Sequence, residues 1–417
     1  MRKTKIVCTI GPASRNPDIL EGLIRAGMDV ARLNFSHGTK EEHRSVLGLI
    51  RSISRDLGKP IAILQDLPGP KFRIGSMAGG EVELKKGDVF TLTMNPVEGD
   101  AKRASVNYPP LIRCVKVGDT LLLADGSIQL EVIAKRPQEA ECRVIMGGIL
   151  SSRKGINVPL ETPSIPSFTQ KDEEDLEWGI EQEVDYVALS FIRRAEDLQK
   201  ARRILEKRGS SIHLIAKIEK GSAIENMPEI LEIADGIMIA RGDLGVEVPL
   251  ETVPVIQKNL IKRANVVGKP VITATQMLKS MVDTTRPTRA EAADVANAVL
   301  DGSDALMLSE ETAVGKYPVE TVRVMSNIIR EAEKTLFYWR NLTHRPDDQR
   351  PLTIEEAIGR AGNDLAYHLQ ARVIITLTES GRTARLVSKY RPDLPILAVT
   401  RHVSTQRQLQ LSWGVHP

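Results

Sequence analysis

The sequence predicts an α/β protein: a (β/α)8 TIM barrel with a small inserted β-barrel lid domain and a partial C-terminal α/β domain. Eight short apolar, β-branched runs alternate with helical patterns, and one interruption breaks this order. The runs are almost continuously hydrophobic, which is typical of parallel strands buried on both faces. Eight such β/α units close naturally into a barrel. The runs lie at 5–10, 29–35, 60–67, 185–191, 213–219, 236–241, 270–275 and 305–309.

The interruption lies between the third and fourth runs. From 71 to 166 the chain has short alternating runs, Gly-Asp turns and no long amphipathic helix, which predicts the inserted β-domain. Because the insert follows a barrel strand at its carboxyl end, we expect it to act as a lid. The barrel then comprises 1–70 and 167–340.

A polar, proline-containing linker at 337–353 should separate the barrel from the C-terminal domain at 353–417. Two strands, at 371–378 and 395–400, and two or three helices form a thin layer there. Such a layer would have an exposed sheet edge, so we expect it to be truncated or to depend on a partner that covers the edge.

Composition limits the class of protein. At 417 residues, with 41% hydrophobic and 27% charged residues, the chain can bury a large core. A net charge of +3 is small for this length and does not indicate a nucleic-acid or membrane partner. Cys8, Cys114 and Cys142 are too few and too scattered for a disulfide framework or a zinc site. With no signal peptide and no apolar run of membrane-spanning length, we expect a reduced, cytoplasmic protein.

Two consecutive strands each end in a cation beside an acid. Lys217 and Glu219 end the fifth run, and Arg241, Gly242 and Asp243 end the sixth. Barrel folds build their sites at the carboxyl ends of the strands. Two carboxylates there can share one hard cation, which we expect to be magnesium because it takes one or two protein carboxylates and leaves room for substrate oxygens. The lysine and the arginine would favour a phosphorylated, multiply anionic substrate. For either pair alone, a surface salt bridge is the alternative.

The other strand ends carry further polar residues, and each of them alone could be a strand-end cap. Gly242 also opens a glycine turn whose backbone N–H groups can hold a carboxylate or phosphate. Thr288 and Glu291 fit a capping box for the helix after the seventh strand, which is a structural role. The polar strand-end residues are Arg32, Asn34, Ser36, His37, Asp66, Ser190, Thr273, Thr275, Ser309 and Glu311.

These motifs together resemble the pyruvate kinase family over nearly the whole chain. The resemblance is carried by GMDVARLNFSHG, LQDLPGPKFRIG, LIAKIEKGSAIENM, DGIMIARGDLGVE and RPTRAEAADVANAVLDGSDALMLSEETAVGKYP, among others. It implies the last step of glycolysis, in which phosphoenolpyruvate and ADP give pyruvate and ATP. It also implies a homotetramer when the chain is complete. Phosphoryl transfer needs positioning and charge neutralisation more than covalent chemistry.

The resemblance further implies roles for single residues. Lys217 would neutralise the transferring phosphoryl group, while Arg32 and Arg73 would clamp its oxygens. Glu219 and Asp243 would hold Mg²⁺ or Mn²⁺. The remaining implied roles are substrate binding by Ser190, Gly242, Asp243 and Thr275, protonation of the enolate through water near Thr275 and Ser309, and nucleotide contacts from Asn34, His37, Arg73 and Lys154.

The potassium pocket of the family has an unusual form here. Asn34, Ser36, Asp66 and the backbone carbonyl of Leu67 match it, but most members have a threonine at the position of Leu67 and a glutamate at that of Lys71. This combination resembles the potassium-independent branch of the family. An ammonium group near the pocket can supply the missing charge, so we expect activity without added K⁺. The alternative is that Lys71 only pairs with a surface acid.

Two other departures concern the lid and the last strand. Ala124-Asp125-Gly126 stands where many members carry two aspartates, and Glu310 follows Ser309 where glycine is usual. Two rival interpretations stay open: another magnesium-dependent barrel enzyme of phosphoenolpyruvate or pyruvate, of the aldolase or mutase type, and an inactive truncated fragment. The insert and Lys154 argue against the first, because such enzymes need no nucleotide lid.

Overall fold

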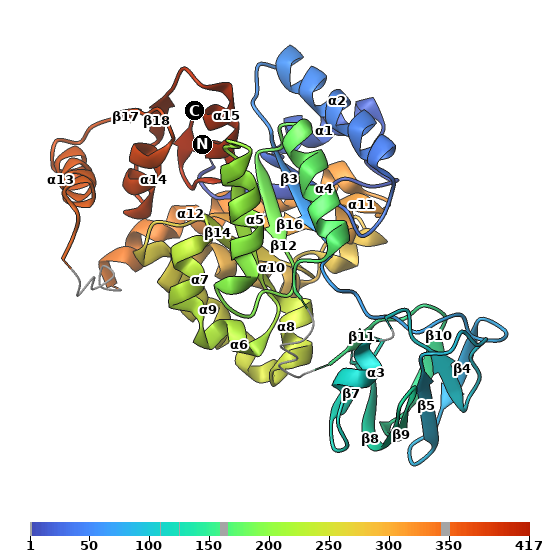
Figure 1. Cartoon of the computed structure of the whole chain (residues 1–417). Helices are drawn as coiled ribbons and strands as arrows, with labels where there is room; N and C mark the ends of the chain where they lie inside the picture. The colour runs from blue at the N-terminus through green and yellow to red at the C-terminus, as the bar shows by residue number, and fades with distance from the viewer. Residues whose placement is uncertain (1, 109, 125, 159–165, 343–350) are drawn as a thin grey trace.

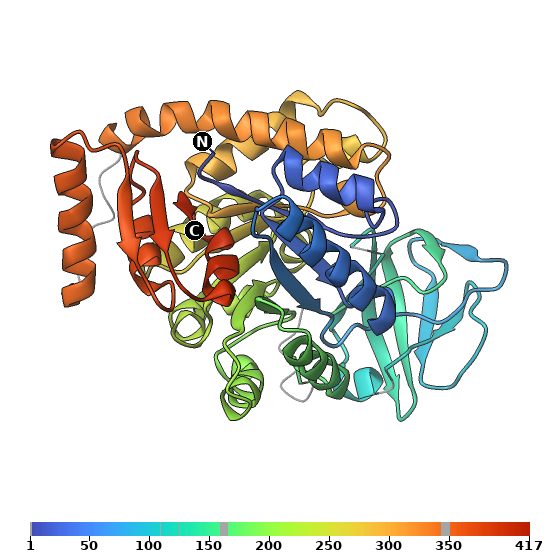
Figure 2. The ribbon, with the colours of Figure 1, turned by 90° about the horizontal axis from the view of Figure 1, so that it is seen from above.

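The computed structural model describes residues 2–108, 110–124, 126–158, 166–342 and 351–417. A closed barrel of eight parallel strands lies between the inserted domain and the C-terminal layer, which are on opposite sides of it in both views (Figures 1 and 2). The predicted barrel is therefore confirmed. Around the barrel the strand order is β1-β16-β15-β14-β13-β12-β3-β2. The strands are β1 (Lys5–Thr9), β2 (Val30–Asn34), β3 (Ala62–Leu67), β12 (Tyr186–Leu189), β13 (His213–Ile218), β14 (Gly236–Ala240), β15 (Val271–Ala274) and β16 (Ala305–Leu308).

Helices surround the barrel, and several begin at the caps that the sequence contains. The predicted box of Thr288 and Glu291 opens α10, with both reciprocal hydrogen bonds present. The last barrel helix is longer than predicted and continues through 337–342, the first residues of the expected linker. The helices of the barrel are α1 (Pro17–Ala26), α2 (Lys40–Asp56), α4 (Gln170–Glu181), α5 (Glu196–Lys207), α6 (Gly221–Glu225), α7 (Met227–Ile233), α8 (Arg241–Glu247), η1 (Leu250–Thr252), α9 (Val253–Val266), η2 (Lys279–Val282), α10 (Arg289–Leu300), α11 (Glu310–Ala313) and α12 (Pro318–Leu342).

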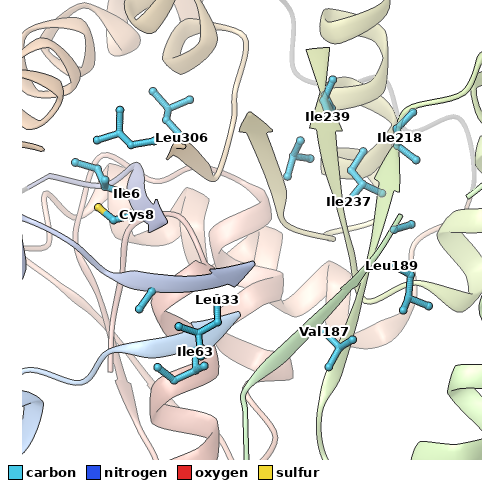
Figure 3. Close-up of a cluster of buried hydrophobic side chains, with 14 of the residues drawn as sticks. Ile6, Cys8, Leu33, Ile63, Val187, Leu189, Ile218, Ile237, Ile239 and Leu306 are labelled. Atoms are coloured by element: carbon cyan, nitrogen blue, oxygen red, sulfur yellow. The ribbon is translucent and has the colours of Figure 1, made fainter. Parts of the chain in front are cut away.

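Successive residues of each barrel strand face two different cores. Ile6 and Cys8 pack outward against the helices, whereas Val7 between them packs inside the barrel. Figure 3 shows side chains of the outer core, such as Leu33 and Ile237, projecting from the strands. Burial on both faces explains why the strand sequences are almost continuously apolar. It also raises the pKa of the Cys8 thiol, because the thiolate would lose its hydration.

The insert forms two sheets, a two-stranded one of order β10-β4 and a six-stranded one of order β11-β7-β8-β9-β5-β6. Arg73 bridges Gly155 beside β11 and Ile74 bridges Val106 beside β6, so one short segment contacts both edges of the larger sheet. Its one helix in the described ranges has five residues. The elements are β4 (Glu81–Leu84), β5 (Val89–Thr93), β6 (Arg103–Ser105), α3 (Pro110–Cys114), β7 (Thr120–Leu123), β8 (Ile128–Arg136), β9 (Glu139–Met146), β10 (Gly148–Ser151) and β11 (Ile156–Asn157).

The C-terminal layer contains both predicted strands and a third that was not predicted. β19 has only two residues, too few for a periodic signal. The layer packs on the amino ends of the barrel strands, where Arg391 pairs with Asp304 at 2.7 Å and Arg407 pairs with Asp185 at 2.7 Å. Its elements are α13 (Ile354–His368), β17 (Ile374–Leu377), α14 (Arg382–Lys389), β18 (Ile396–Val399), α15 (Val403–Gln408), η3 (Leu409–Leu411) and β19 (Val415–His416). Within the described ranges, no helix combines the length and the apolar character that crossing a membrane requires.

Candidate active site

Five adjacent barrel strands, from β2 through β3, β12 and β13 to β14, bring the predicted residues to one end of the barrel. At the centre is Asp66, which lies at the carboxyl end of β3 and is almost fully buried. Its Oδ2 accepts from Arg32 Nε at 2.7 Å, and its Oδ1 lies 3.2 Å from Lys217 Nζ. Lys217 Nζ also lies 2.8 Å from Glu219 Oε1. Two cations and two carboxylates therefore form one buried network.

The charges of this network stabilise one another. Burial disfavours the charged form of Lys217, but Asp66 and Glu219 outweigh it and raise the pKa of Lys217 above its ordinary value. Burial likewise opposes the charge of Asp66, yet Lys217 and Arg32 lower the pKa of that carboxyl. Both groups are thus held ionised at neutral pH. A fixed ammonium at the floor of a site is suited to neutralising a phosphoryl oxygen.

Ser190 and the backbone complete the surroundings of Lys217. Lys217 Nζ donates to Ser190 Oγ at 2.7 Å, and Ser190 Oγ donates to the carbonyl oxygen of Leu67 at 2.7 Å. The second oxygen of Glu219 accepts from the backbone N–H of Phe191 at 2.9 Å. An ammonium has three N–H donors. Those of Lys217 meet Asp66, Glu219 and Ser190, so a bound phosphoryl group would have to replace one of these contacts.

The predicted potassium pocket contains the ammonium group of Lys71. Lys71 Nζ donates to Ser36 Oγ at 2.6 Å, and the backbone N–H of Ser36 donates to Asn34 Oδ1 at 3.1 Å. Lys71 as a residue is exposed, but the packing around its ammonium group and the nearby Lys217 lower its pKa, against the opposing effect of Asp66. The other two predicted ligands, Asp66 and the Leu67 carbonyl, are already engaged by Lys217, Arg32 and Ser190.

At the ends of β14 and β15, the expectation that Arg241 helps to attract a phosphorylated substrate is wrong. Its guanidinium donates to Asp294 Oδ1 at 2.8 Å and to the carbonyl oxygen of Thr275 at 2.8 Å, and is not directed at a substrate anion. The reason is that α8 begins at Arg241 itself, directly after the strand, and its side chain runs beside the loop that follows β15. Gly242 and Thr275 do meet as predicted, because the Gly242 N–H donates to Thr275 Oγ1 at 2.9 Å.

Asp243 lies on the wall of a cavity of about 330 Å³ between the barrel and the insert. The predicted residues Arg73 and Lys154 line the same cavity from the side of the insert. Of the described residues that line it, six are cationic and Asp243 is the one acid: Lys71, Arg73, Arg153, Lys154, Arg193 and Lys220. Arg153, Arg193 and Lys220 were missed from the sequence. Arg153 could have been found by its place beside Lys154, but the other two look like ordinary helix-flanking charges.

His37 is exposed and lies near this cationic wall. Partial burial of the imidazole lowers the pKa of His37, and Lys71, Arg73 and Arg32 lower it further by repelling the protonated form. His37 is therefore neutral at pH 7, so it can offer a ring nitrogen as a hydrogen-bond acceptor or donor but no charge.

At the end of β16 the structure gives a role to Glu310, which the sequence left unexplained. Glu310 forms an exposed ion pair with Lys279 of η2. Next to it, the buried carboxylate of Glu311 accepts from the backbone N–H groups of Ser309 at 2.7 Å and Leu278 at 3.1 Å. The buried Ser309 hydroxyl has no hydrogen-bond partner in the part of the chain that the structure describes. Asp125, the lid departure, lies outside the described residues.

The carboxylates of Glu219 and Asp243 suit a magnesium ion. Across the described ranges, no three His, Cys, Asp or Glu side chains converge as a metal site. Two carboxylates from adjacent strand ends, one of them at the cavity wall, agree with the preference of Mg²⁺ for few protein ligands plus water and substrate oxygens. Both donors are hard oxygens, so the chemistry of the donor set fits the ion.

Comparisons with known proteins agree with this arrangement. Sequence models of the pyruvate kinase barrel domain and of the pyruvate kinase alpha/beta domain match residues 1–322 and 356–417. A pyruvate kinase of Sporosarcina psychrophila is 49% identical over 420 residues, covering 100% of this chain and 72% of the relative, and one of Staphylococcus aureus is 48% identical over 419 residues with the same coverage. The crystal structure of a pyruvate kinase from Cryptosporidium parvum matches with a TM-score of 0.92 at 41% identity, covering 100% of this chain and 86% of that one.

Proposed function

Because the chain belongs to the pyruvate kinase family, whose members are phosphotransferases, we propose that it transfers the phosphoryl group of phosphoenolpyruvate to ADP, giving pyruvate and ATP. The observation that carries this proposal is the buried network of Lys217, Asp66, Glu219 and Arg32 beside a cationic cavity. Cations held in a water-poor site stabilise the charge that develops on a transferring phosphoryl group.

In this proposal three cations act on the phosphoryl group. Lys217 neutralises one oxygen, and Arg32 and Arg73 clamp the others from the barrel and the insert. Glu219 and Asp243 would hold Mg²⁺, or Mn²⁺ in its place, which would supply positive charge for the phosphoryl and substrate oxygens. Asp66 holds Lys217 and Arg32 in place before the substrate binds, and Lys217 would exchange one of its three contacts for a phosphoryl oxygen.

The three-carbon part of the substrate would lie between β14 and β15. Its carboxylate would meet Thr275 and the backbone of Gly242 and Asp243, beside Ser190. Protonation of the enolate would occur near Thr275 and Ser309, through water. The nucleotide would contact Asn34, His37 and Arg73 from the barrel side and Lys154 from the lid, where the cations of the cavity suit an anionic phosphate chain.

We further propose that the enzyme works without added K⁺. The hydrogen bond from Lys71 to Ser36 supports an ammonium group in place of the ion, and the ion pairs of Asp66 with Arg32 and Lys217 reduce the negative charge available to K⁺.

The remaining elements of the proposal concern the whole protein. We propose that the chain is divided into a barrel (1–70 and 167–340), a lid (71–166) and a regulatory domain (353–417). We also propose a cytoplasmic location, a homotetramer for a complete chain, and no nucleic-acid or membrane partner, in keeping with the net charge of +3.

The test is an assay of the purified chain with phosphoenolpyruvate, ADP and Mg²⁺ in K⁺-free buffer, following pyruvate, with K⁺ then added. Pyruvate that forms only when ADP is present supports the kinase, and its formation before K⁺ is added supports the role of Lys71. Activity only after K⁺ addition keeps the kinase and discards that role. Pyruvate formation that does not need ADP would point to another barrel enzyme of this substrate. A folded chain with no activity in either buffer would favour an inactive fragment.

A further inference from the structure

Every N–H donor of Arg241 is used inside the protein. A guanidinium has five of them in a fixed planar fork. Nε donates to the carbonyl oxygen of Ala274 at 3.3 Å, and Nη1 donates to Asp294 Oδ1 at 2.8 Å and Gln257 Oε1 at 3.3 Å. Nη2 donates to the carbonyl oxygen of Thr275 at 2.8 Å and contacts Met277 Sδ at 2.9 Å. Arg241 therefore binds the loop after β15 and leaves no donor for a substrate.

The loop that Arg241 binds has a strained backbone. Thr275 has a φ of +71° and Gln276 a φ of +55°. A β-branched residue in this left-handed region is a true outlier, and such a conformation persists only where the surroundings impose it. The contacts of Arg241 with the carbonyl oxygens of Ala274 and Thr275 lie on either side of the strained Thr275 Cα, which is where a restraint is needed.

The left-handed turn places the Thr275 hydroxyl. Thr275 Oγ1 accepts from the Gly242 N–H at 2.9 Å and donates to the Ala274 carbonyl oxygen at 2.6 Å. Gly242 follows Arg241 directly, and Asp243 comes next, so one arginine joins the start of α8 to the loop after β15. The hydroxyl of Thr275 and the backbone at the start of α8 are thereby held relative to each other.

We propose that Arg241, oriented by Asp294 of α10, is a positioning residue that holds Thr275 in its left-handed conformation and so aligns the three-carbon substrate for reaction. This inference rests on the proposed function, because it concerns the same site. Arg241 itself touches no reacting atom. Asp294 is about one-third exposed, whereas Arg241 is mostly buried, so the carboxylate anchors the arginine from the outer side.

The test compares Arg241→Lys and Asp294→Asn with a matched control, Arg202→Lys. Arg202 likewise donates to a carboxylate, Asp235 at 2.7 Å, and to a carbonyl oxygen, that of Ile233 at 2.7 Å, but lies away from the site. Lysine keeps the charge and loses the planar fork. For R241K we expect kcat/KM for phosphoenolpyruvate to fall by about 100-fold, as for a displacement of about 1 Å in a reacting group. KM for ADP should stay within about twofold of the wild type.

D294N keeps the contacts of Arg241 with Thr275 and Ala274, so it should fold even where R241K does not, and we expect it to lose roughly tenfold in kcat/KM. A purely structural role would lower the melting temperature of R241K as it does that of R202K, and would leave kcat and both KM values of the folded enzyme unchanged. If R241K gives that outcome, and the kcat and KM values of D294N also match those of R202K, the inference is overturned and the proposed function stands. A wild-type chain that makes no pyruvate overturns the proposed function and the inference with it.

Discussion

The buried network at the ends of the barrel strands and the insert wall of the neighbouring cavity differ in how their charges are held. On the barrel side, the side chains of Asp66, Glu219 and Lys217 are at most 11% exposed and are paired with one another. On the insert side, Arg153 and Lys154 are exposed to solvent. Buried charges must be matched within the fold, whereas exposed ones are hydrated and need no partner. The charges of the buried network are therefore fixed by the fold, whereas the exposed cations of the insert wall are hydrated.

This difference predicts different consequences for mutations in the buried network and on the insert wall. Removing a cation from the buried network should damage both folding and catalysis, because it leaves a buried carboxylate unmatched. Removing a charge from the insert wall should change only the binding of the anion. The predictions below test this contrast.

Lys217→Met should have the largest effect. It leaves Asp66 and Glu219 buried with one cation fewer, so we expect the free energy of unfolding to fall by about 3–5 kcal/mol. The rate should fall at least about 10³-fold, because the phosphoryl group loses its nearest fixed charge. Urea unfolding and kcat at saturating substrates measure the two effects. A variant that keeps wild-type kcat would show that Lys217 only stabilises the fold.

Lys71→Gln should convert the enzyme to K⁺ dependence. We expect about a tenfold or greater loss of kcat in K⁺-free buffer and recovery on addition of K⁺, because the ion can then enter the pocket beside Ser36. The wild type adds a second check. The pKa of Lys71 is lowered from 10.5, so its charge is lost as the pH rises through a value below 10.5. K⁺-free activity should therefore decline on the alkaline side earlier than an ordinary lysine would allow. Equal activity of K71Q and wild type without K⁺ would discard this role.

Lys154→Ala should raise KM for ADP by roughly tenfold and change kcat and the melting temperature little, since it removes one exposed cation from the cavity. Lys116→Ala is the matched control, an exposed lysine of the same insert that does not line the cavity. If both variants have the same KM for ADP, the lid does not contact the nucleotide through Lys154.

The smallest effect on catalysis is expected at the other end of β13, where the partly buried His213 packs edge-on against Tyr186. Burial lowers the pKa of His213 to about 4, so between pH 6.5 and 4 the unfolded chain binds more protons than the folded one. The free energy of unfolding is therefore unaffected by His213 above pH 6.5, and it decreases as the pH falls from 6.5 towards 4. His213→Phe should reduce the loss of unfolding free energy between pH 7 and 5 by on the order of 1–2 kcal/mol, with kcat at pH 7 unchanged. An unaltered pH dependence in urea unfolding would show that other groups cause it.

The sequence alone predicted the barrel, which the structure confirms, and it placed most of the candidate site residues at the carboxyl ends of the strands. The eight strands could be predicted because burial on both faces leaves a local signature, a short run with almost no polar residue. Lys217, Glu219, Arg241 and Asp243 could be placed at one end of the barrel because all strands of a parallel barrel end at the same edge, although Arg241 takes Asp294 as its partner in the structure. Position along the chain therefore sufficed to gather these residues, with no knowledge of their contacts.

Only the tertiary structure decided which partner each side chain takes. Arg32 and Asp66 are 34 residues apart, and Arg241 and Asp294 are 53 apart, each pair on different β/α units. Whether a strand-end arginine faces a substrate or a neighbouring loop depends on the direction in which the chain leaves the strand. Arg241 begins a helix and points to the loop after β15. This direction results from packing between β/α units, which a local sequence pattern cannot predict.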